Sequence, residues 1–128
     1  MKVEIWSDVV CPWCYIGKRR FEAALGEFSQ REAVEVTWRS FELDPGAPKR
    51  LEISLDEMLA KKYAMPLVKA AAMREQVTSV AAEDGLEFHL DRAQSGNTFD
   101  AHRLIHLASE RGLGAPGEGC DASGCGVP

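Results

Sequence analysis

The alternation of polar and apolar positions at the start of the chain changes to a helical period after residue 10. Residues 3–7 alternate and a dense apolar stretch follows, which predicts a largely buried first strand. From Pro12 onward, one helix face collects positions three and four apart: Cys14, Gly17, Phe21, Ala24, Leu25 and Phe28. We expect Gly17 to let this helix approach the sheet closely. Residues 34–38 alternate again, and the whole predicts a βαβ unit with parallel strands.

Three more helices are predicted, over residues 54–63, 66–84 and 97–111. The first opens with a capping box, in which Ser54 and Glu57 satisfy each other's free backbone N–H groups. The last begins at Asn97 or Thr98, whose short polar side chains suit a helix start. The alternating residues 86–90 predict an extended connector.

These patterns divide the chain into three parts. Residues 1–46 form the βαβ unit, and residues 47–113 form an all-helical insertion. Residues 114–128 are glycine-rich and lack periodicity, which predicts a disordered tail.

Composition narrows the class of protein. The chain has 128 residues, of which 45% are hydrophobic and 27% charged, so it has room for one ordinary domain core. Its formal net charge of −5 argues against nucleic acid or an anionic membrane as partners. The sequence contains no signal-peptide pattern and no apolar run long enough to cross a bilayer, so we expect a cytoplasmic protein.

The candidate chemistry lies at the junction between the first strand and the first helix, in the motif Cys11-Pro12-Trp13-Cys14. Two cysteines one helical turn apart can alternate between a dithiol and a disulfide. Pro12 suits the first helical position, where a missing N–H costs nothing. Cys11 then lies at the helix N-terminus, where free amides and the positive dipole end favour a thiolate and lower its pKa. Cys11 is therefore the expected nucleophile and Cys14 the resolving thiol. Pro12 and Trp13 between them are the expected tuning residues of the site.

Three ordered motifs carry a family resemblance. SDVVCPWCYIGK at residues 7–18 resembles the active-site segment of DsbA-family oxidoreductases of the FrnE type. FELDP at residues 41–45 and NTFDAHRL at residues 97–104 resemble two further segments of that branch. Its relatives include 2-hydroxychromene-2-carboxylate isomerases and kappa-class glutathione transferases. The resemblance implies an α/β, thioredoxin-like fold with an inserted helical domain, and a thiol–disulfide oxidoreductase or isomerase.

The resemblance also implies partners and further site residues. Protein or small-molecule disulfides and dithiols would be substrates, with glutathione among them, and the chemistry requires no cofactor or metal. Asn97, Thr98 and His102 would line a substrate groove. A complete thioredoxin-like domain has later strands and a closing helix, for which residues after Gly112 offer no candidate. We therefore expect a C-terminally truncated fold with impaired activity and a tendency to self-associate.

Alternatives remain open from the residues. A kappa-class glutathione-dependent enzyme would carry a serine in place of Cys11, so the intact cysteine pair argues against it. A non-catalytic binding or assembly module would fit the missing half of the sheet. The two cysteines with His102 and His106 could form a Cys₂His₂ zinc site. The tail's two cysteines, Cys120 and Cys125, could act as a second dithiol or be incidental.

Overall fold

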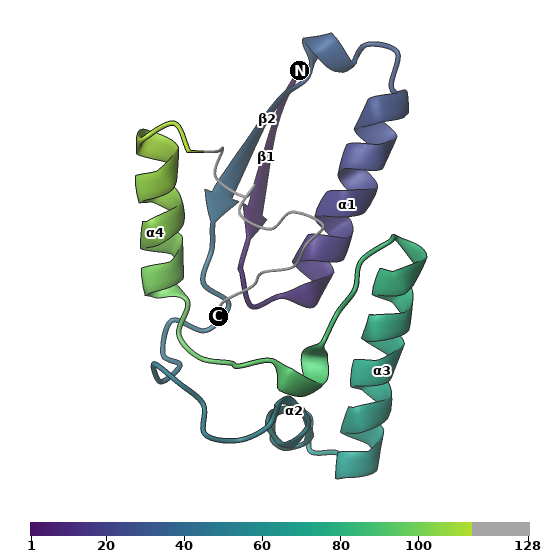
Figure 1. The fold of residues 1–128 in the computed structure, drawn as a ribbon, viewed down its shortest axis with the longest axis vertical. Coiled ribbons are helices and arrows are strands. Elements are labelled where there is room, and N and C mark those ends of the chain that lie inside the picture. The colour runs from purple at the N-terminus through teal and green to yellow at the C-terminus, as the bar shows by residue number, and fades with distance from the viewer. Residues whose placement is uncertain (114–128) are drawn as a thin grey trace.

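Residues 1–113 are described by the computed structural model, and they begin with the predicted βαβ unit (Figure 1). β1 (Lys2–Ser7) and β2 (Glu35–Ser40) pair in parallel, from Lys2 opposite Glu35 to Ser7 opposite Ser40. The connection between them consists of α1 (Pro12–Glu27) and the short 3₁₀ helix η1 (Arg31–Ala33). The α/β class and the parallel pairing predicted from the alternation are confirmed.

The helical part follows the predicted order. It comprises α2 (Leu55–Lys62), α3 (Leu67–Glu83), the 3₁₀ helix η2 (Leu90–Arg92) and α4 (Phe99–Glu110). The capping box before α2 is confirmed, because Ser54 Oγ accepts the Glu57 N–H and the Glu57 carboxylate accepts the Ser54 N–H. Residues 86–89 are irregular and lead into η2, so the connector is only partly extended. None of the described helices is long and apolar enough to cross a membrane.

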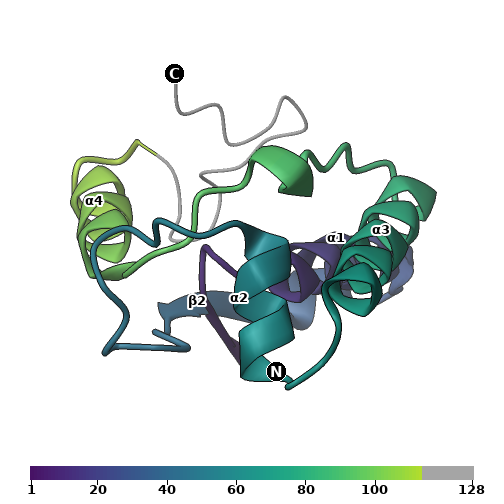
Figure 2. The ribbon, with the colours of Figure 1, turned by 90° about the horizontal axis from the view of Figure 1, so that it is seen from below.

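α4 returns to the strands after the chain has passed through α2 and α3. Both ribbon views place α4 and α1 on opposite sides of the two strands (Figures 1 and 2). The segment before α2 and the segment before α4 lie side by side. The Leu51 N–H donates to the Ser95 carbonyl and the Asn97 N–H to the Pro48 carbonyl, both at 2.8 Å. This crossing brings residues 97–102 to the ends of the strands.

The apolar core is small and lies between α1 and α3. Ile16, Ala81 and Leu86 are its buried members, and Phe88 stacks on Tyr15 with ring centroids 5.9 Å apart. β1 is not buried as predicted: its residues alternate between exposed and half-buried, and Trp6 is 58% exposed. The reason is geometric, because within residues 1–113 this strand has a single paired neighbour.

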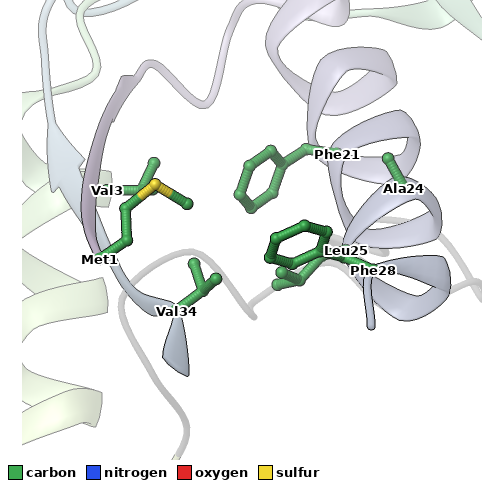
Figure 3. A pocket seen from close by; sticks show the side chains of 7 residues that line it. All are labelled: Met1, Val3, Phe21, Ala24, Leu25, Phe28 and Val34. Carbon is green, nitrogen blue, oxygen red and sulfur yellow. The ribbon is translucent and has the colours of Figure 1, made fainter. Parts of the chain in front are cut away.

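Two apolar cavities separate α1 from the strands. One, of about 250 Å³, lies at the N-terminal end of β1, and the side chains around it come from both layers (Figure 3): Met1, Val3, Phe21, Ala24, Leu25, Phe28 and Val34. The second, of about 270 Å³, reaches Cys14 and is lined in part by Gly17 and Trp38. The predicted close approach at Gly17 is wrong, since a Cβ there would meet nothing within 4 Å.

Candidate active site

The two motif cysteines lie in the first turn of α1. Cys11 occupies the position just before the helix with an extended backbone, and Pro12 follows at the first helical position. The Cys14 N–H donates to the Cys11 carbonyl at 3.1 Å, and the Cys14 side chain lies near enough to influence the pKa of the Cys11 thiol. Both cysteines are free and half-buried, while Trp13 between them is 52% exposed. The turn geometry therefore brings the two sulfurs together.

The electrostatics of Cys11 differ from the expectation. Burial raises the pKa of the Cys11 thiol above its ordinary value, and the side-chain hydrogen bond with Cys14 raises it further. Backbone hydrogen bonds from Cys14 and Trp13 lower the same pKa, as a helix N-terminus should, but their effect is smaller. The predicted net lowering is therefore wrong in direction, because desolvation outweighs the amides.

Asp8 is a buried carboxylate directly before the cysteine turn. It is 3% exposed, although it follows a strand whose charged residues face solvent. Its carbonyl accepts the Cys11 N–H at 3.2 Å, and its Oδ2 accepts the Leu43 N–H at 2.8 Å. In the sequence, Asp8 was noted only as part of the motif SDVVCPWCYIGK, with no role of its own. The available signal was a charged residue placed within an otherwise apolar stretch, because a buried carboxylate requires specific partners.

His102, on α4, supplies the other partner. It is 7% exposed, and its Nε2 lies 3.1 Å from Asp8 Oδ1 and 3.1 Å from the Phe41 carbonyl oxygen. The Phe41 carbonyl oxygen can only accept a hydrogen bond, so Nε2 carries a proton. The sequence placed His102 in a substrate groove, and that role stays a prediction. In the described fold its ring nitrogen bonds to the protein itself.

Asn97 and Thr98 stand beside this contact. The Asn97 side-chain amide donates to the Pro45 carbonyl at 3.1 Å, and its Oδ1 accepts the Phe99 N–H at 3.0 Å, at the start of α4. Thr98 is buried and its carbonyl accepts the His102 N–H at 3.0 Å. The three residues of the NTFDAHRL motif thus meet at one place, and their roles toward substrate stay predictions.

The four residues of the alternative zinc site do not converge. Within residues 1–113, no three His, Cys, Asp or Glu side chains are grouped as metal ligands would be. His106 is exposed and its Nε2 lies 2.9 Å from Ser40 Oγ, whereas His102 faces Asp8. Cys120 and Cys125 lie outside the described residues.

Comparison with known proteins defines the class. Residues 2–117 match the family model of the DSBA-like thioredoxin domain, and the chain belongs to that family. It is similar to a solved structure, a probable DsbA oxidoreductase from Streptomyces coelicolor, with 51% identity and a TM-score of 0.82. The match covers 88% of this chain and 48% of that one. The uncharacterised protein YwbO of Bacillus subtilis (strain 168) is 40% identical over 50 residues, which are 39% of this chain and 23% of YwbO. The matched segments thus cover less than half the length of either relative.

Proposed function

We propose that the chain acts as a thiol–disulfide oxidoreductase of the protein disulfide oxidoreductase or isomerase type. One observation carries the proposal: two free, half-buried cysteines lie one turn apart at the start of α1. Membership of the DSBA-like family and the similarity to a probable DsbA oxidoreductase support it. Cys11 is the nucleophile because it is the cysteine at the helix terminus, where backbone amides stabilise the thiolate once it forms.

The reaction proceeds through a mixed disulfide. The Cys11 thiolate attacks one sulfur of the substrate disulfide, so a Cys11–substrate bond forms and the other substrate sulfur leaves as a thiolate. The Cys14 thiolate then attacks Cys11 Sγ, forms the Cys11–Cys14 disulfide and releases the second substrate sulfur. Two electrons pass to the substrate, and the two thiol protons end on the released sulfurs. The reverse sequence oxidises a substrate dithiol.

Apolar side chains around Cys11 suit protein disulfides as substrates. Val9, Val10 and Trp13 are exposed beside the cysteine turn and offer a rim for an apolar segment of an unfolded chain. Small disulfides, glutathione disulfide among them, reach the same sulfur. We propose a cytoplasmic location for the reaction, as the sequence pattern led us to expect.

Reduction of insulin by dithiothreitol tests this function. The chain should accelerate insulin precipitation above background, though slowly, and both Cys11→Ser and Cys14→Ser should return it to background. Equal rates for the three proteins would contradict the proposal. A Cys11→Ser protein that conjugates glutathione to an electrophile would instead support the kappa-class alternative, which uses a serine at this position.

Exposed apolar surface favours a second function, that of an assembly module. Trp6 on β1 and Phe41 after β2 are exposed, and two apolar cavities remain between α1 and the strands. Unpaired strand edges and apolar patches recruit other chains. We propose that a second copy of the chain covers this surface. Sedimentation equilibrium should show concentration-dependent association, and 8-anilinonaphthalene-1-sulfonate should fluoresce on binding; a monomer that binds no dye would overturn this proposal.

A further inference from the structure

Resting on the proposed function, we propose that Asp8 and His102 form a positioning pair for Cys11. The pair would hold the redox turn, residues 8–11, in the orientation from which Cys11 Sγ attacks a disulfide. Neither side chain touches the substrate in this role. Both act through the backbone of the turn.

Asp8 connects three segments that are far apart in the sequence. Its carboxylate binds Leu43 after β2 and His102 on α4, which are 35 and 94 residues away, and its carbonyl binds the Cys11 N–H. The Cys11 carbonyl in turn accepts the Cys14 N–H. A continuous path of hydrogen bonds therefore runs from α4 through Asp8 to both redox cysteines.

The chemistry of the pair makes this path rigid. Asp8 Oδ1 is buried and receives its hydrogen bond from His102 Nε2. Because the same N–H also faces the Phe41 carbonyl, the ring is held between two acceptors and cannot turn without losing both. Loss of the ring leaves Asp8 with a buried oxygen that must find water, and the turn must move for it to do so.

Movement of the turn should slow attack by Cys11 more than it disturbs the rest of the fold. Disulfide exchange requires the attacking sulfur to approach along the bond that breaks, and a misplacement of about 1 Å can cost roughly a hundredfold in rate. By contrast, the exposed turn residues Val9 and Val10 pack against little that would restrain the turn in place of Asp8.

The test measures how fast Cys11 attacks glutathione disulfide in the full chain carrying Cys14→Ser, where the reaction stops at the mixed disulfide. Peptide mass mapping follows the adduct on Cys11 and separates it from other cysteines. His102→Leu should slow this step about tenfold. His102→Gln, whose side-chain amide can donate to Asp8, should recover the parent rate to within about threefold.

The matched control is His106→Leu, one turn further along the same helix. His106 is exposed and bonds to the Ser40 side chain on β2 rather than to Asp8. This variant should leave the rate unchanged. A His102→Leu protein that loses stability but reacts at the parent rate would overturn the proposal, since a purely structural histidine behaves in that way.

Two outcomes separate this inference from the proposed function. If the Cys14→Ser parent forms no Cys11 adduct, the oxidoreductase function and the positioning role both fail. If the parent reacts and His102→Leu matches it, only the positioning role fails. Should His102→Leu not fold by circular dichroism, Asp8→Asn decides, because it keeps the side-chain size. The same slowing is expected, and a folded Asp8→Asn protein with the parent rate would contradict the proposal.

Discussion

Two regions of the molecule are built in opposite ways. At the carboxyl ends of the strands, Asp8, Asn97 and His102 join segments far apart in the sequence through specific hydrogen bonds. Between the strands and α1, apolar side chains line two open cavities, one of which is drawn in Figure 3. Directional hydrogen bonds determine the geometry of the first region. In the second, residues 1–113 leave the space between α1 and the strands partly empty.

The difference shows what each region contributes. Hydrogen bonds to buried polar groups select one arrangement, because any other leaves a donor or acceptor unpaired. Burial of apolar side chains supplies most of the folding free energy, but only where these side chains fill the interior to native density. The junction around Asp8 should therefore be specific in geometry, and the layer over α1 should be tolerant of change.

Removal of the Asp8 carboxylate should have the largest effect on stability. Asp8→Ala leaves the Leu43 N–H without its acceptor and leaves the His102 Nε2–H with the Phe41 carbonyl alone, which should cost about 2–4 kcal/mol of unfolding free energy. Urea unfolding followed by circular dichroism measures it. The control is Asp100→Ala on α4, an exposed carboxylate bonded to Arg103, which should cost less than about 0.5 kcal/mol. Equal losses would show that the junction has no special role.

A pair of glycine substitutions contrasts the two regions directly. A Cβ at Gly96 would clash with the Lys49 carbonyl oxygen, so Gly96→Ala should force apart the segment before α2 and the segment before α4. The expected cost is about 1–3 kcal/mol. Gly17→Ala, facing open space inside α1, should instead stabilise by up to about 1 kcal/mol through helix propensity. If both substitutions shifted the urea midpoint in the same direction, the proposed difference between the two regions would be contradicted.

The capping box of α2 offers a smaller effect, remote from both regions. Ser54→Ala removes the acceptor for the Glu57 N–H and should cost about 1 kcal/mol. Hydrogen bonds from Ser54 lower the pKa of Glu57 below its ordinary value of 4.5. The folded pKa is depressed, so this contribution is present above pH 4.5 and is lost as the pH falls through the folded pKa. The difference in unfolding free energy between the parent protein and Ser54→Ala should therefore narrow on acidification. A difference that widens would contradict the attribution of the lowered pKa of Glu57 to Ser54.

Local signals in the sequence predicted the elements well. Pro12 at the first position of α1 and the Ser54–Glu57 capping box depend on residues a few positions apart, and both are found in the structure. The contact of Asp8 with His102 spans 94 residues, so periodicity could not reveal it. The space at Gly17 depends on what packs above it, which no local pattern encodes.

The local geometry of the cysteine turn was predictable from the sequence, whereas the pKa of Cys11 was not. At this spacing the two cysteines share one helical turn, which the motif predicts, and their redox roles stay predictions. The raised pKa of Cys11 depends on its burial against the rest of the fold, and that quantity follows from tertiary packing. Backbone amides at the helix terminus lower the pKa of Cys11, as the sequence predicts, but burial raises this pKa by more.

The most direct test of the central claim is mixed-disulfide trapping with single-cysteine variants of the redox motif. Reduced Cys14→Ser protein is mixed with a disulfide-bonded substrate such as insulin, quenched with acid and mapped by mass spectrometry. The account predicts an adduct on Cys11 that accumulates, because no thiol remains at position 14 to resolve it, and no adduct on Cys14 in the Cys11→Ser protein. An adduct on Cys14 in Cys11→Ser protein, or none on Cys11 in Cys14→Ser protein, would contradict it.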